Sequence, residues 1–316
     1  MKVAIKLAVV LSFLWMASAI AGEVGPWAGQ RPAQSRLILE SVGYVGTGTQ
    51  RAGVQIKLDH GWWTYWRAPG ASGMPPMFDW SGSENLADEP EMIWPMPLRS
   101  VAYGEALNLY KNEVVFPVEF RAADPARPVR LHVRVTYGIC REVCIPKTAV
   151  HDLVLPPAAG SVKINPTTAR LIASYAGRKP SHDPAETGLQ IGGVDTMLDG
   201  AKVFLSIRVN GLKTRRSSLV LVEGPDMVRV AEVRARATGD AKTKLLMLKL
   251  GSTAQMRNLS GKRIRITLID GDRALEQVWV VGSQASSLVG FELTPAPRRP
   301  MDPAGSWTTN LGPGAE

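Results

Sequence analysis

The chain has 316 residues, of which 45% are hydrophobic, and it carries a formal net charge of +9 at pH 7. The length exceeds the usual size of a single core, so we expect two domains. The basic residues are scattered, and no basic run is interleaved with aromatic residues. We therefore interpret the charge as a solvated surface and expect no nucleic-acid partner.

The first 21 residues have the pattern of a secretory signal peptide. Lys2 and Lys6 form a basic start, and the apolar run 7–16 is too short for a stable membrane anchor. Residues 19–21 provide an A-x-A cleavage site. An uncleaved anchor is the alternative. We expect export to an oxidising compartment, the bacterial periplasm, where disulfides persist.

Residues 35–156 are predicted to form a first β domain, after an irregular segment rich in Gly and Pro. Short runs of alternating apolar and polar residues, separated by turn residues, are typical of strands. Several such strands in succession favour an all-β, immunoglobulin-like β-sandwich. The expected strands cover residues 36–43, 53–59, 62–66, 77–80, 113–121, 129–137 and 150–155.

Residues 157–188 are predicted to form a helix and a linker. Asn165 is a good N-cap, Pro166 fits the first helical position, and Gly177 is a natural stop.

Residues 189–283 are predicted to form a second small β-sandwich with a hairpin turn at Asp270-Gly271. Its expected strands cover residues 202–209, 218–223, 228–234, 244–250, 263–269 and 274–281. Residues 290–316 are rich in Pro, Gly and Arg, and we expect a disordered tail.

The two cysteines of the chain, Cys140 and Cys144, are four positions apart. A cross-link over so short a loop stabilises a fold by only about 2 kcal/mol in the loop-entropy model. Cycling between dithiol and disulfide is therefore a better reason for the pair than stapling the fold, although a permanent disulfide joining two strand ends remains the alternative. The pattern leaves open which sulfur attacks. Apart from His151, no other Cys or His is near, so we expect no metal site.

The residues around the cysteines resemble the N-terminal domain of the DsbD thiol:disulfide interchange proteins and the related ScsB-type proteins. The resemblance covers roughly residues 35–156, and its matching segments are 61–70, 75–76, 78–82, 94–95, 103–104, Tyr110, 116–117 and 137–146. It implies an immunoglobulin-type sandwich in which Cys140 and Cys144 are the redox pair. In that family the pair takes reducing equivalents from a thioredoxin-like domain and gives them to periplasmic acceptors.

The resemblance also implies a covering loop, which residues 100–104 match. In the family the covering aromatic sits one place earlier, where this chain has Ala102, so we expect Tyr103 to replace it, next to Gly104. Tyr137 and Trp66 are expected at the cap or partner groove. The cysteines are also closer together than in better-known members, so the ring is tighter.

The resemblance further implies redox partners and no cofactor. The transmembrane and thioredoxin-like domains of DsbD have no counterpart in this sequence. We therefore expect a separate donor, either a membrane thiol carrier of the CcdA or DsbD type or a thioredoxin-like protein. Periplasmic disulfide proteins would be the acceptors, which makes the chain a candidate protein-disulfide reductase.

Two other functions stay open. One is a non-enzymatic binding or assembly module with an inert disulfide. The other is a copper-handling protein, because thioethers such as those of Met74, Met77, Met92 and Met96 suit Cu(I). The sequence has no G-x-S-x-G elbow, P-loop or dinucleotide fingerprint, so hydrolase and nucleotide chemistry have no support.

Overall fold

The computed structural model describes residues 24–282 and 285–287, with gaps at 45, 47, 71, 159–161, 200–201, 214–217, 225–232, 238–242 and 251–258. The expected signal peptide, the expected tail and most of the expected strand 228–234 lie outside these residues. In the part of the chain that is described, no helix is long and apolar enough to cross a membrane.

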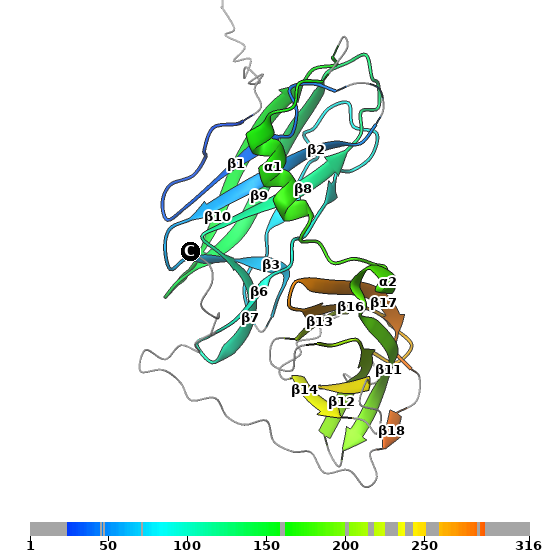
Figure 1. The fold of residues 1–316 in the computed structure, drawn as a ribbon. Helices are drawn as coiled ribbons and strands as arrows, with labels where there is room; N and C mark the ends of the chain where they lie inside the picture. The colour runs from blue at the N-terminus through cyan, green and yellow to red at the C-terminus, as the bar shows by residue number, and fades with distance from the viewer. Residues whose placement is uncertain are drawn as a thin grey trace, which may run out of the picture.

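The first domain is a sandwich of two antiparallel sheets (Figure 1). One sheet has the order β1-β2-β8-β5, and the other has the order β10-β9-β3-β7-β6 with β4 paired to β9. The strands are β1 (Ala33–Leu39), β2 (Gln50–Leu58), β3 (Trp63–Gly70), β4 (Met77–Asp79), β5 (Glu91–Met92), β6 (Leu98–Ala102), β7 (Glu105–Lys111), β8 (Glu113–Phe120), β9 (Val129–Cys140) and β10 (Cys144–Leu155). The predicted all-β sandwich is confirmed.

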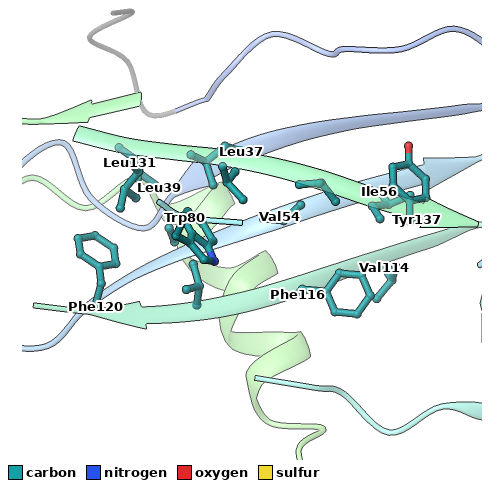
Figure 2. Close-up of a cluster of buried hydrophobic side chains, with 14 of the residues drawn as sticks. Leu37, Leu39, Val54, Ile56, Trp80, Val114, Phe116, Phe120, Leu131 and Tyr137 are labelled. Carbon is teal, nitrogen blue, oxygen red and sulfur yellow. The ribbon is translucent and has the colours of Figure 1, made fainter. Parts of the chain in front are cut away.

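The core of the first domain lies between these sheets and is rich in aromatic side chains. Figure 2 shows Trp80 and Phe116 among aliphatic residues of β1, β2 and β9. Trp66 and Trp80 are buried, and Trp62 and Trp94 pack against the same cluster. Because each aromatic side chain buries about 150–250 Å², a few of them dominate a sandwich of this size. These four tryptophans therefore belong mainly to the core.

Several strand boundaries of the first domain differ from the prediction, and two of the differences affect the site. β3 continues through Pro69 to Gly70, whereas we expected it to end before them. Residues 100–104, predicted as a loop, belong to a β-hairpin of β6 and β7, whose two-residue turn is Tyr103 and Gly104. Both turn residues have positive φ, 53° and 78°, as a type I′ turn requires. The usual sequence signal for that turn is Asn-Gly or Asp-Gly, so Tyr-Gly was not recognised.

The predicted helix is confirmed as α1 (Pro166–Ala176). The side chain of Asn165 accepts hydrogen bonds from the backbone N–H groups of Thr167 and Thr168, which are donors that the first turn leaves without partners. Ile172 anchors the helix to the first sheet by packing against Ile38 and Val115. A short second helix, α2 (Pro184–Thr187), was not predicted within the linker.

The second domain also consists of two sheets, with the orders β14-β15-β12-β11-β18 and β13-β16-β17 (Figure 1). Its strands are β11 (Gln190–Asp199), β12 (Lys202–Asn210), β13 (Leu219–Glu223), β14 (Val233–Ala237), β15 (Thr243–Lys249), β16 (Arg263–Asp270), β17 (Arg273–Val280) and β18 (Ala285–Ser287). β11 was not among the expected strands. Asp270 pairs with Arg273, so the hairpin turn is Gly271-Asp272, one residue later than predicted.

Candidate functional site

The cysteines lie at the adjoining ends of two paired strands. β9 ends at Cys140, β10 begins at Cys144, and the two residues are partners in the antiparallel register. Their Sγ atoms form a disulfide with an S–S distance of 2.02 Å. The backbone N–H of Arg141 donates to the carbonyl of Val143 within the connecting loop. Pairing of β9 with β10 is therefore sufficient to bring the two thiols together.

The two halves of the disulfide differ in exposure. Cys140 is 1% exposed, whereas Cys144 is exposed to solvent. Side chains alternate along β9, so Tyr137 and Ile139 face the sandwich core while Cys140 joins a separate cluster with Leu107 and Leu109. The accessible end of the disulfide is therefore Cys144.

Tyr65 is the residue of this site that sequence reasoning missed. Its O–H donates to Cys140 Sγ at 2.9 Å and lies 3.7 Å from Cys144 Sγ. Burial raises the pKa of the Tyr65 phenol above its ordinary value, so the hydroxyl keeps its proton and remains a donor. The sequence signal that could have identified Tyr65 is strand alternation. It places Tyr65 on the same side of β3 as Trp63, the register partner of Cys140.

The hairpin of β6 and β7, residues 98–111, lies against the disulfide, and we call it the cap hairpin. Leu107, Leu109 and Ala102 of this hairpin belong to the cluster that buries Cys140. At its tip, the Tyr103 O–H donates to the backbone carbonyl of Arg141, inside the loop between the cysteines. Tyr103 is nevertheless 73% exposed, so the tip is held at the disulfide chiefly by this hydrogen bond.

The structure places the other predicted site residues differently. Gly104 forms the turn of the cap hairpin beside Tyr103. Trp66 and Tyr137 are 0% and 1% exposed and belong to the sandwich core. Both contribute to packing in this structure, and their expected role at a partner groove stays a prediction.

The loop between the cysteines carries two charged side chains. Arg141 and Glu142 form an exposed ion pair in the loop, and the Arg141 guanidinium lies 5.8 Å from the ring centre of Trp62. Among the described residues, no group of three or more His, Cys, Asp and Glu side chains could hold a metal ion. Met92 and Met96 pack against the sandwich core, whereas Met77 is exposed.

Fold and site define an all-β protein whose first sandwich carries a local disulfide beneath a β-hairpin. Residues 39–156 match the family described as the N-terminal domain of the thiol:disulfide interchange protein DsbD. The resemblance predicted from the residues around the cysteines is therefore confirmed.

The structure is also similar to a solved protein, the N-terminal periplasmic domain of ScsB from Proteus mirabilis. The TM-score is 0.62 at 20% sequence identity, and the match covers 82% of this chain and 98% of the other. At this identity the likeness shows a shared fold, and it extends beyond the family match. No curated protein sequence matches the chain significantly.

Proposed function

We propose that this protein carries out thiol–disulfide interchange in the periplasm through Cys140 and Cys144. It would pass reducing equivalents from a membrane thiol carrier, or a thioredoxin-like protein, to periplasmic disulfide proteins. The observation that carries the proposal is the asymmetry of the disulfide, because Cys144 is exposed while Cys140 is buried against a hydroxyl donor. The family that residues 39–156 match and the periplasmic ScsB domain support the same function.

In the reductive half, a thiolate of the donor attacks Cys144 Sγ. The Cys140–Cys144 bond breaks, Cys140 leaves as a thiolate, and a mixed disulfide joins the donor to Cys144. The Tyr65 O–H donates a hydrogen bond to the departing Cys140 sulfur, which stabilises its charge. The second thiolate of the donor then attacks the donor sulfur of the mixed disulfide and releases Cys144. The donor ends as a disulfide, having transferred two electrons, and the released cysteines take up protons from water.

In the oxidative half, the Cys144 thiolate attacks a disulfide of the acceptor. One acceptor sulfur leaves as a thiolate, and the other forms a mixed disulfide with Cys144. Cys140 then attacks Cys144 Sγ, which closes the Cys140–Cys144 bond and releases the acceptor as a dithiol. Cys144 is thus the residue that meets partners, and Cys140 resolves the mixed disulfide.

The cap hairpin gates this chemistry in the proposal. A partner must bring its sulfur into line with the disulfide, and Tyr103 lies against the loop that the partner must approach. The hydrogen bond from Tyr103 to Arg141 is a single contact near the surface. It can therefore open for each partner in turn without unfolding the sandwich.

Trapping of mixed disulfides tests the proposal. Reduced Cys140→Ser protein, which keeps only Cys144, is expected to accumulate a covalent adduct with a thioredoxin-like partner oxidised at its own cysteines. The matched Cys144→Ser protein keeps only the buried Cys140 and is expected to form far less adduct. Equal trapping by both variants, or none by either, would contradict the proposed roles.

An inert disulfide in a binding module is the second candidate. It is favoured by the placement of both cysteines as register partners at strand ends, where a cross-link fixes the β9–β10 hairpin. This candidate predicts a disulfide that strongly resists reduction, with a potential below about −300 mV.

A further inference from the structure

Arg67, on β3, joins the two domains through a partly buried ion pair. Its Nε and Nη2 atoms donate to the carboxylate of Glu223 on β13 at 2.8–3.1 Å. Nη2 also donates to Glu276 on β17. The side chains of Arg67, Glu223 and Glu276 are only 15%, 22% and 11% exposed. The guanidinium therefore sits between two carboxylates of the second domain and is largely shielded from water.

The residues around Arg67 form a packed interface between the two domains. The Thr267 hydroxyl donates to Glu276 at 2.8 Å, and the Arg67 guanidinium lies 4.3 Å from the ring centre of Trp66. Beside these polar groups, Leu221 and Ile269 of the second domain belong to the same hydrophobic cluster as the core of the first domain. A planar guanidinium held by several partners and by apolar packing fixes geometry better than an exposed ion pair does.

The strand that Arg67 occupies is also the strand of the redox site. Trp63 is the register partner of Cys140, and the Tyr65 hydroxyl bonds to the Cys140 sulfur. After Tyr65, which pairs with Leu109, the regular pairing of β3 with β7 is interrupted until Gly70. Arg67 lies in this irregular stretch, where the second domain supplies the contacts instead of the sheet ladder.

The same stretch of β3 is bonded to β7 of the cap hairpin and, through β7, to β6. The carbonyl of Ala68 accepts a hydrogen bond from the Asn108 amide on β7 at 2.8 Å. Asn108 in turn accepts one from Arg99 on β6 at 3.0 Å. A short chain of contacts therefore runs from the second domain through residues 67 and 68 to the cap hairpin, while Tyr65 links the strand to the disulfide.

We propose that Arg67 is a positioning residue through which the second domain holds the cap hairpin and Tyr65 at the disulfide. The inference rests on the proposed function and gives the second domain a role in it. When the Arg67 contact is lost, residues 66–69 loosen, the cap hairpin opens more often, and small thiols reach the disulfide sooner. Tyr65 is then held less firmly at Cys140, so the Cys140 thiolate loses stabilisation.

The test compares Arg67→Ala and Glu223→Gln in the full chain with Arg51→Ala. Arg51 pairs with Glu119 at 2.9 Å on the other sheet of the first domain, so it controls for loss of an arginine ion pair. Two quantities are measured, namely hydrogen exchange of the amides in residues 98–111 and the rate of disulfide reduction by dithiothreitol. Both are expected to rise about five-fold or more in the two test variants, the lower end of usual coupling between sites. The Arg51→Ala protein is expected to match the wild type.

The Arg67→Lys variant tests whether the forked geometry of the contact with Glu223 matters, beyond its charge. Lysine keeps the charge but cannot form the forked contact with Glu223, so it is expected to restore only part of the protection. A second readout is the pH at which Cys140 of the reduced protein becomes reactive toward an alkylating agent. This pH is expected to rise in Arg67→Ala and to stay at the wild-type value in Arg51→Ala, which a loss of stability alone would not produce.

Unchanged hairpin exchange and unchanged reduction rates in folded Glu223→Gln protein would overturn the positioning role. Glu223→Gln keeps the shape of the glutamate side chain, so the test remains decisive even if the Arg67→Ala protein fails to fold. Neither measurement needs a physiological partner. Failure of mixed-disulfide trapping in the cysteine variants would therefore refute the proposed function while leaving the coupling result to be judged separately.

Discussion

The two sandwiches of this chain have similar architecture but different contents. The first core contains Trp66, Trp80, Tyr44 and Phe116, and this domain holds both cysteines. The buried cluster of the second domain consists of leucine, isoleucine and valine side chains in its described residues. The second domain has no cysteine in its sequence, and Trp279 is its one tryptophan. The comparison teaches that the reactive groups lie in one sandwich, whereas the described core of the other sandwich is aliphatic.

The polar groups of the second domain that reach the first domain lie at one interface. Glu223 and Glu276 both point at Arg67, and no other carboxylate of the second domain forms a described ion pair with the first. Under our two proposals the domains differ in role, because the first carries the chemistry and the second positions the cap hairpin. Four changes in the first domain test how far this division holds.

Removing both thiols has the largest expected effect. Cys140→Ser with Cys144→Ser should abolish thiol exchange completely, because the second domain has no cysteine thiol to replace them. The short cross-link contributes only about 2 kcal/mol to the free energy of unfolding, so the protein should stay folded. Residual exchange with a dithiol donor, measured by alkylation trapping, would show that the division between the domains is wrong.

The next largest expected effect is a loss of folding stability at acidic pH, and we expect it in the first domain. Burial lowers the pKa of His151 to about 4, and its Nε2 lies 2.9 Å from the Ser35 hydroxyl. The unfolded chain, with a histidine pKa near about 6.5, binds more protons than the folded chain between these values, so stability falls as pH falls. The loss over this window is about 3 kcal/mol when complete.

Denaturant unfolding at pH 7 and pH 4.5 measures this loss. His151→Gln, which cannot take up the proton, should lose much less stability over the same interval. The second domain contains no histidine between residues 189 and 283, so its unfolding should change less in this range. An equal loss in His151→Gln and wild type would assign the acid sensitivity to other groups.

Tyr65→Phe should slow exchange without disturbing the fold. The phenyl ring keeps the packing against Leu107 and Leu109, while the hydrogen bond to Cys140 Sγ is lost. Hydrogen bonds to charged groups contribute about 1.5–3 kcal/mol, so stabilisation of the Cys140 thiolate should fall by about ten-fold or more. The pH dependence of Cys140 alkylation measures the shift. An unchanged profile would leave Tyr65 as a packing residue.

Tyr103→Phe has the smallest expected effect. It removes one hydrogen bond, from the cap hairpin to the Arg141 carbonyl, and such a bond contributes about 0.5–1.5 kcal/mol. Reduction by dithiothreitol should therefore be faster by about two- to ten-fold. Val101→Ala on the same hairpin, away from that hydrogen bond, is the control. A slower reaction in Tyr103→Phe would contradict the gating role of Tyr103.

Local signals made much of this fold predictable from the sequence. Alternation gave most strands of both sandwiches, and the cap at Asn165 with Pro166 placed the helix. The cysteine pair was predictable from its spacing of four positions, and the structure then places Cys140 and Cys144 opposite each other in paired strands. These features depend on residues close together in the chain, where the sequence pattern is most informative.

The parts that were missed depend on contacts between distant residues. Tyr65 reaches Cys140 across 75 positions, and Arg67 reaches Glu223 across 156. An aromatic strand with Trp62, Trp63, Tyr65 and Trp66 does not say which ring faces the disulfide until the sheet is assembled. The cap hairpin was missed for a local reason, because Tyr103 adopts a positive φ that non-glycine residues seldom take.

The most direct test of the central claim is the reduction potential of the Cys140–Cys144 pair. It is measured by equilibrating the purified protein with defined thiol buffers and trapping the free thiols by alkylation. Thiol–disulfide interchange predicts a value between about −180 and −270 mV, the range spanned by known exchange proteins. A value below about −300 mV, or a pair that stays oxidised throughout, would contradict it and make the disulfide structural.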